Sequence, residues 1–237
     1  MVPHDAVCGW DDGPVTTEHP HSVRTFKRRV GRLTSTQEDA LSRLWSRFGL
    51  EADGSVLDLP AVFGRSAPVV LEIGFGMGEA TALMAQAQPG LDVLAADVHT
   101  PGHGNLLKLL EASELTNVRL VSGDARVLLA AMLPAASLRA VRVFFPDPWP
   151  KRKHHKRRLV TPAFVALVAS RLEPGGTLHL ATDWADYAEQ MLAVCTAEPT
   201  LRGGVTPRPH WRPVSKFEQR AREDGRTVCD LLLVRSG

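Results

Sequence analysis

The sequence predicts an α/β fold in which a mostly parallel, twisted sheet of seven strands carries helices on both faces. Apolar runs of strand length alternate with helical segments, and the links between them are short. A glycine-rich turn, 74–78, follows the first buried apolar run. Four aspartates each lie at the carboxyl end of an expected strand: Asp97, Asp124, Asp147 and Asp183. Because open α/β sheets bind ligands along this edge, the sequence also predicts where the site lies.

The elements follow one another along the chain. Ser35 and Glu38 have the spacing of a capping box and predict a helix through Phe48 with one apolar face. The expected strands are 69–73, 92–98, 118–121, 140–145, 177–181, 205–214 and 227–235. The further helices are expected at 79–88, 104–113, a segment ending near 134, 160–172 and 184–197.

The composition is that of a globular protein: the chain has 237 residues, is 44% apolar and 23% charged, and carries a net charge of +2. We expect a basic, disordered arm over residues 1–35 and one domain over 36–237. The three cysteines are far apart, so neither a zinc site nor a disulfide is expected. No signal peptide or membrane-length apolar run is present, which favours the cytoplasm. Both a monomer and a homodimer fit the sequence.

The glycine spacing indicates which cofactor the turn suits. Gly74, Gly76 and Gly78 do not follow the dinucleotide pattern, because Glu79 takes the place of its third glycine. Glu72 precedes them and would repel a pyrophosphate, whereas it suits the sulfonium and ammonium of S-adenosylmethionine; the alternative is a salt-bridged structural acid. Asp97 is placed to accept hydrogen bonds from ribose hydroxyls.

Adenine recognition is expected next along the sheet edge. There Asp124 and the Ala125 backbone would meet the adenine.

The stretch 144–158 is the most unusual in the chain. Asp147 stands between two prolines, which predict a stiff extended turn, and Trp149 follows. We expect Trp149 either to stack on a nucleobase or to pack as a wall of the site. Six of the eight residues after Pro150 are cations expected to contact RNA phosphates: Lys151, Arg152, Lys153, Lys156, Arg157 and Arg158.

A second cationic segment, 24–32, includes Arg28 and Arg29. It is either an RNA-contacting arm or a solvated tail.

Taken together, five motifs resemble those of the bacterial tRNA (guanine-N7)-methyltransferases. They run in the family order: 71–78, 144–149, 156–158, 181–184 and 216–218. The resemblance implies a Rossmann-like class I methyltransferase fold, S-adenosylmethionine as the methyl donor, and N7 of guanine 46 in the tRNA variable loop as the acceptor.

The resemblance also implies roles for individual residues. At the cofactor it places Glu72, Asp97, Asp124 and Asp147, with Asp147 as the catalytic residue. At the substrate it places Lys151, Asp183, Ser215, Lys216, Phe217 and Glu218. The alternative for Lys216 and Glu218 is an ordinary pair of charged residues on the surface. Asp97 stands where the family usually has Glu, and Ser215 where it usually has Thr.

Three other functions compete with this interpretation. They are a methyltransferase acting on an exocyclic amine, a non-catalytic RNA-binding protein with a relict fold, and an NAD-dependent dehydrogenase. The first is disfavoured because Asp147-Pro148-Trp149 lacks the second proline of Asp-Pro-Pro-aromatic loops, and the last by the glycine spacing.

Overall fold

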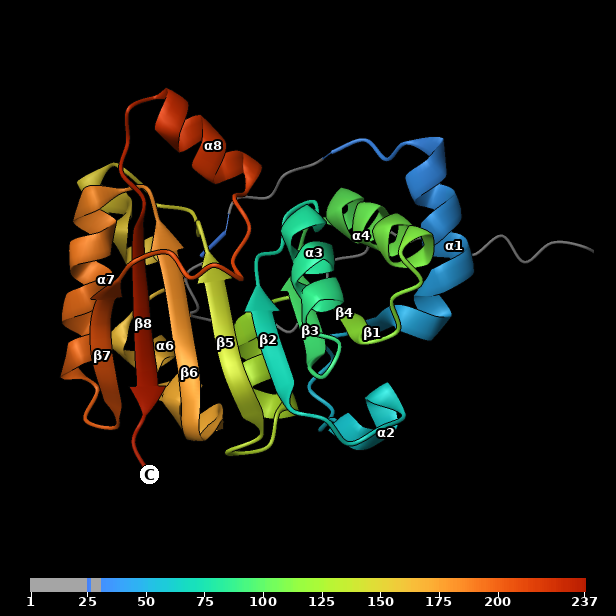
Figure 1. Cartoon of the computed structure of the whole chain (residues 1–237), viewed down its shortest axis with the longest axis horizontal. Coiled ribbons are helices and arrows are strands. Elements are labelled where there is room, and N and C mark those ends of the chain that lie inside the picture. The colour runs from blue at the N-terminus through green and yellow to red at the C-terminus, as the bar shows by residue number, and fades with distance from the viewer. Residues whose placement is uncertain (1–24, 27–30) are drawn as a thin grey trace, which may run out of the picture.

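A single sheet organises the computed structural model, which describes residues 25–26 and 31–237. Over this part of the chain eight strands pair in the order β1-β4-β3-β2-β5-β6-β8-β7, which Figure 1 shows from right to left. All neighbours pair in parallel except β8, which runs antiparallel to β6 and β7. The strands are β1 Gly49–Glu51, β2 Val69–Ile73, β3 Asp92–Asp97, β4 Val118–Ser122, β5 Leu138–Phe144, β6 Leu172–Thr182, β7 Leu201–Thr206 and β8 Cys229–Arg235.

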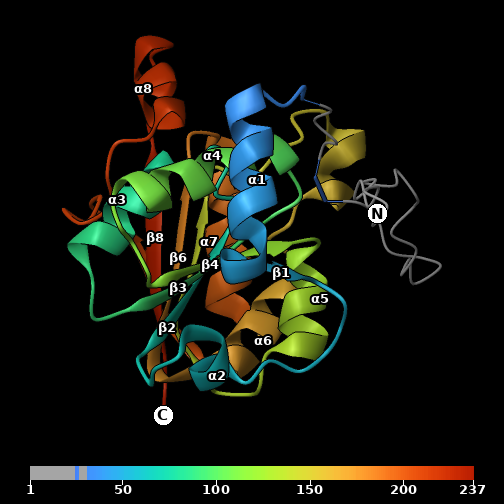
Figure 2. The ribbon, with the colours of Figure 1, turned by 90° about the vertical axis from the view of Figure 1, so that its right-hand side faces the viewer.

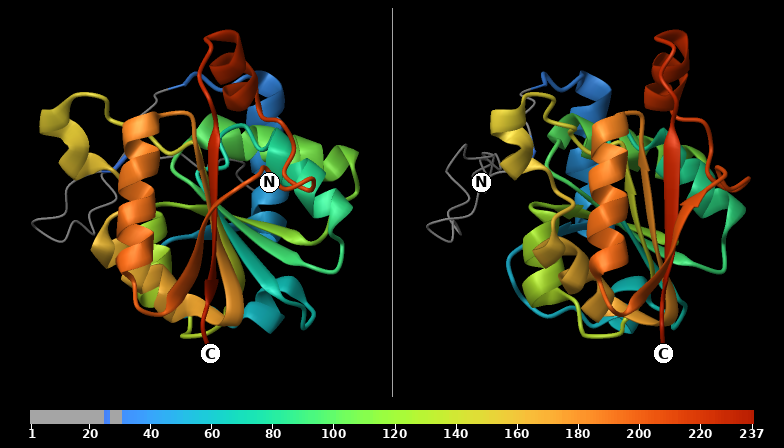
Figure 3. Two further views of the ribbon diagram at one scale, coloured as in Figure 1. Left: turned by 60° about the vertical axis from the view of Figure 1, so that its left-hand side comes forward. Right: turned by 90° about the vertical axis from the view of Figure 1, so that its left-hand side faces the viewer.

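Helices cover both faces of the sheet, as the sequence predicts (Figures 2 and 3). One apolar core lies between the sheet and α1, α3 and α4, and a larger one between the sheet and α2, η1, α6 and α7. The helices are α1 Ser35–Phe48, α2 Leu59–Phe63, α3 Glu79–Ala87, α4 Thr100–Ala112, α5 Ala125–Val127, the π-helix η1 Leu128–Met132, the 3₁₀ helix η2 Arg152–Arg157, α6 Pro162–Arg171, α7 Ala185–Ala197 and α8 Lys216–Glu223.

The first helix spans the expected residues, but its capping box is shifted by one position. Thr34, not Ser35, is the N-cap: its hydroxyl accepts from the Gln37 amide at 3.3 Å. The Gln37 side chain accepts in turn from the Thr34 amide at 2.9 Å. The Ser35–Glu38 assignment is therefore wrong, although the mechanism is the expected one.

Four short elements were not expected, and one strand lies earlier than expected. The sequence did not indicate β1, α2, η2 or α8, and β1 makes the sheet eight-stranded rather than seven-stranded. The strand expected at 205–214 is β7, which begins at Leu201 and ends at Thr206. Prolines at 207, 209 and 213 have no amide proton for a ladder, so the chain leaves the sheet there.

The segment between β7 and α8 crosses the face of the sheet, as Figure 1 shows. Trp211 in this segment contacts side chains of two strands. Its ring lies 4.3 Å from the Arg142 guanidinium on β5 and packs edge-on against His179 on β6. The segment therefore covers this part of the sheet, where a helix would otherwise pack. It leads to α8, which lies at the edge where strands β2 to β6 end.

Among the described residues, no helix combines the length and the apolar character that crossing a bilayer would require.

Candidate active site

A cavity of about 210 Å³ opens at the carboxyl edge of the sheet. Four carboxylates that the sequence singled out line it together, namely Glu72, Asp97, Asp124 and Asp147. They come from β2, the end of β3, and the loops after β4 and β5. The prediction that strand-end aspartates meet at one edge is confirmed for Asp97, Asp124 and Asp147, whereas Asp183 does not line the cavity.

The glycine turn between β2 and α3 lines one wall of this cavity. Gly74, Gly76 and Gly78 have φ of 80°, 62° and 80°, a region that residues with a Cβ seldom occupy. A Cβ at Gly78 would lie 2.7 Å from the Leu106 side chain on α4. Gly74 and Gly76 face the cavity, whereas Gly78 caps α3 behind the lining residues. The turn therefore lets a ligand approach the backbone directly.

Glu72 is a deeply buried acid of the site. It is 3% exposed, and its Oε2 has no hydrogen-bond partner among the described residues. Burial raises the pKa of Glu72 to about 7, although the Arg142 guanidinium opposes this shift. Arg142 stands directly opposite on β5 and also donates to Gln88 at 2.8 Å. The buried carboxylate thus has an oxygen without a partner among the described residues, which suits a cationic or hydrogen-bond-donating ligand.

Asp97 and Asp124 both organise backbone at the cavity. Asp97 accepts from the Gly76 amide at 2.8 Å and from the amides of Val98 and His99 at 2.7 and 3.0 Å. Asp124 caps α5 by accepting from the Arg126 amide at 2.9 Å and pairs with the Arg126 guanidinium at 2.6 Å. Because a carboxylate has about four acceptor positions, Asp97 retains capacity toward a ligand. At Asp124, N–H groups of Arg126 already contact both oxygens.

Asp147 lies in a loop whose backbone is held in an uncommon shape. Phe145 and Trp149, on either side of it, have φ of 53° and 46°, which costs of order 1–3 kcal/mol for each such residue. The Phe145 amide donates to the Ala181 carbonyl on β6 at 2.8 Å. On the other side of Asp147, the Arg158 guanidinium donates to the Pro148 carbonyl at 2.9 Å. The expected stiff turn is present, and its neighbours fix it at both ends.

Trp149 packs within the protein and is not among the residues that line the cavity. It is 8% exposed, and its indole N–H donates to the Thr25 carbonyl at 3.2 Å. The His154 ring lies nearly parallel to it, and the Arg157 guanidinium lies 4.9 Å from its ring. Of the two expected roles, the structure favours packing over base stacking.

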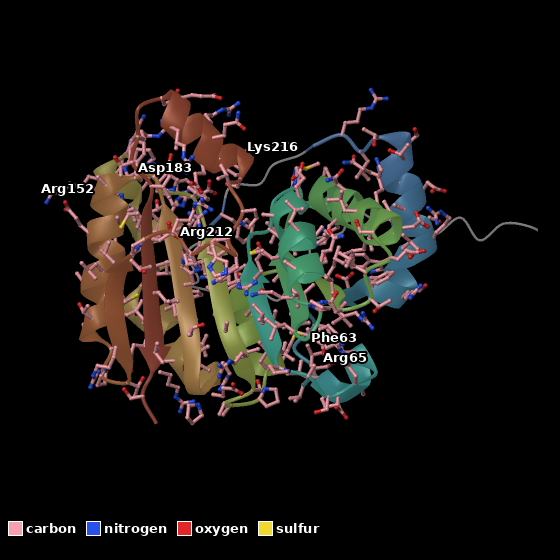
Figure 4. All side chains as sticks on the ribbon, viewed as in Figure 1. Phe63, Arg65, Arg152, Asp183, Arg212 and Lys216 are labelled. Carbon is pink, nitrogen blue, oxygen red and sulfur yellow. The ribbon has the colours of Figure 1, made fainter. Side chains whose placement is uncertain are left out.

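The basic run forms η2, and its members separate into two groups. Lys151, Arg152, Lys153 and Lys156 are exposed, and Figure 4 shows Arg152 projecting from the surface. Arg158 is 1% exposed and pairs with Asp186 at 2.7 Å, so its expected phosphate contact is wrong. Arg157 is half-buried against Trp149. Arg28 and Arg29 lie outside the described residues.

The residues expected at the substrate occupy different places. Ser215 and Phe217 line the cavity, where the Ser215 hydroxyl caps α8. Lys216 reaches across to Glu79 on α3 at 2.5 Å. Asp183, labelled in Figure 4, is outside the cavity lining. It pairs with Arg226 at 2.8 Å.

Glu218 is buried and does not line the cavity. It is 1% exposed and pairs with Arg212 at 2.7 Å and with Arg222 at 2.5 Å. Arg212, which was not expected at the site from the sequence, lines the cavity and also donates twice to Asp230 on β8 at 2.8 Å. Its only sequence signal is its place between Trp211 and Pro213 in a proline-rich segment.

Comparisons with known proteins agree with this architecture. The family described as "Putative methyltransferase" matches residues 66–231. A tRNA (guanine-N(7)-)-methyltransferase of Streptomyces avermitilis is 53% identical over 94% of this chain and 78% of its own length. One of Nitrosospira multiformis is 54% identical over 91% of this chain and 96% of its own length.

Solved structures support the same fold. The 16S rRNA methyltransferase KamB superposes with a TM-score of 0.54 at 16% identity, over 90% of this chain and 99% of its own. A 16S rRNA (adenine(1408)-N(1))-methyltransferase of Catenulisporales acidiphilia gives 0.52 at 17% identity, over 78% and 98%. The fold is that of the class I methyltransferases, and on sequence the chain belongs to the tRNA (guanine-N7)-methyltransferase family.

Proposed function

We propose that this protein transfers the methyl group of S-adenosylmethionine to N7 of a guanine in tRNA, at position 46 of the variable loop, in the cytoplasm. The names of its relatives support the reaction and the substrate. The observation that carries the proposal is the buried Glu72 oxygen without a partner, among the described residues, at the end of a cavity that a glycine turn borders. A pyrophosphate would be repelled there, which disfavours a dinucleotide.

The residues present fit S-adenosylmethionine. Glu72 would hold the cationic methionine end, and the Gly74 and Gly76 backbone would lie along it. Asp97 would accept from the ribose hydroxyls, and Asp124 with the Ala125 amide would meet the adenine. When bound, S-adenosylmethionine supplies an electrophilic methyl group on its sulfonium.

The acceptor atom needs alignment more than it needs a base. Guanine N7 has a free lone pair and loses no proton when it attacks the methyl carbon. Holding N7 in line with the carbon and its leaving sulfur can supply roughly 7–11 kcal/mol of the barrier. Asp147 accepts hydrogen bonds from the guanine N1–H and amino group in this mechanism. It thereby selects guanine, and its charge stabilises the positive charge that develops on the ring.

The exposed cations of η2 would bind the tRNA backbone. Lys151, Arg152, Lys153 and Lys156 extend from the loop that carries Asp147, so phosphates bound there lie near the reacting base. A loop guanine costs less to unstack than a paired one, which suits a variable-loop target.

The test is methyl transfer from labelled S-adenosylmethionine to unmodified tRNA, with identification of the product nucleoside. We expect 7-methylguanosine, and no transfer to the same tRNA with adenine at position 46. Label in an N-methylated exocyclic amine would refute the reaction. Transfer to both tRNAs, with 7-methylguanosine at another guanine, would refute only the position.

A further inference from the structure

Two phenylalanine rings face the mouth of the cavity from distant parts of the chain. Phe145 follows β5, and Phe217 lies in the first turn of α8. Their planes are inclined by only 19°, their centroids are 6.2 Å apart, and both rings line the cavity. We call them the aromatic pair.

Phe217 presents an unusual amount of apolar surface. It is 47% exposed, one of the few large apolar side chains among the described residues that are so exposed. Its ring also lies over the glycine turn, because a Cβ at Gly76 would be 3.9 Å from Phe217 Cε2. An exposed ring that borders an acidic cavity suits a flat ligand with one apolar face and one polar edge.

The position of Phe217 depends on its neighbours in α8. Glu218, the next residue, pairs with Arg212 at 2.7 Å, and Arg212 is held by Asp230 on β8. On the other side of Phe217, Lys216 pairs with Glu79 at the start of α3 at 2.5 Å. The Lys216 pair is exposed and contributes little, so Phe217 is positioned mainly through the buried Glu218, which acts as a positioning residue for it.

Phe145 is fixed by its own backbone. Its positive φ and its amide hydrogen bond to Ala181 hold it at the end of β5, and the Arg212 guanidinium lies 5.8 Å from its ring. Two residues later the chain reaches Asp147. A base lying against the aromatic pair would thus have a carboxylate near its edge.

We propose that the aromatic pair is the surface on which the target guanine stacks, and that it favours the base in its methylated, cationic form. This inference rests on the proposed function and adds the contact that holds the base. Stacking on an aromatic ring restrains a base without reading its sequence. Methylation at N7 places positive charge on the ring, and the negative face of an aromatic side chain attracts such charge. The aromatic pair would therefore bind the transition state more tightly than the neutral guanine.

Three variants test the proposal. Phe217→Leu keeps an apolar side chain but removes the ring, Phe217→Tyr restores a ring, and Val214→Ala changes an exposed apolar residue of the same segment that does not line the cavity. We expect Phe217→Leu to lower kcat/KM for tRNA about 10-fold or more, with S-adenosylmethionine affinity within about 2-fold. Phe217→Tyr and Val214→Ala should stay within about 3-fold of the wild type.

A binding measurement tests the preference for the cation. The wild-type protein should bind 7-methylguanosine monophosphate about 5-fold or more tightly than guanosine monophosphate, and Phe217→Leu should lose this difference. Equal activity of Phe217→Leu and the wild type would overturn the inference. So would a parallel loss of S-adenosylmethionine affinity, which would assign the ring to the methyl donor. Failure of the wild type to form 7-methylguanosine would instead refute the proposed function.

Discussion

Replacing Glu72 by glutamine should stabilise the protein at alkaline pH in the absence of ligand. The folded state keeps a proton on Glu72 up to about pH 7, whereas an unfolded glutamate releases it near the ordinary value of 4.5. Between these values the folded state holds the extra proton, so the wild type loses stability as the pH rises. At 1.36 kcal/mol per pH unit, the interval costs about 3 kcal/mol. A glutamine side chain at this position cannot ionise and avoids this cost.

The assay is urea unfolding of both proteins at pH 5 and pH 8 without ligand. The free energy of unfolding of Glu72→Gln, relative to the wild type, should increase by about 2–3 kcal/mol between the two pH values. A Glu223→Gln variant, changed at an exposed position on α8, controls for the loss of one carboxyl group. A relative stability that is the same at pH 5 and pH 8 would refute the reasoning, because it would mean that burial does not hold the proton on Glu72.

Three further predictions concern catalysis, RNA binding and the buried ion network. Asp147→Asn should lower kcat about 100-fold while S-adenosylmethionine affinity, measured by calorimetry, stays within about 2-fold; an equal loss of affinity would place Asp147 at the methyl donor. The double variant Lys153→Ala, Lys156→Ala should reduce the slope of log affinity for tRNA against log salt by about 2, and an unchanged slope would remove both residues from the RNA surface. Asp230→Asn should cost about 1–3 kcal/mol in urea unfolding, because the buried Arg212 guanidinium loses the Asp230 carboxylate and keeps Glu218 as a charge partner; a loss below about 0.5 kcal/mol would contradict that assignment.

The parts of the site that depend on strand ends could be predicted from the sequence. Buried strands of a parallel sheet are continuous apolar runs, so the runs at 69–73 and 92–97 mark both the strands and the edge where Glu72 and Asp97 meet. The glycine turn could also be predicted from the sequence, because its positive φ angles disfavour most other residues. These features depend on local sequence alone.

The parts that depend on long-range packing could not be predicted in this way. Glu218 looks like half of a surface pair in sequence, yet the segment that crosses the sheet buries it beside Arg212. Arg158 belongs to a run of cations but turns inward to Asp186 on α7. Trp149 is in the loop of the catalytic acid and is nevertheless covered by η2 and Thr25. In each case a contact from outside the local segment decides whether the side chain faces solvent.

The most direct test of the central claim is calorimetric titration of the protein with S-adenosylmethionine and with NAD⁺ at pH 8 and pH 6. We expect one site for S-adenosylmethionine and no measurable binding of NAD⁺. Affinity should fall about 10-fold at pH 6, because Glu72, whose pKa is about 7, must ionise to accept the ligand's cation. Binding of NAD⁺ in preference to S-adenosylmethionine, or an affinity that is the same at both pH values, would contradict the central claim.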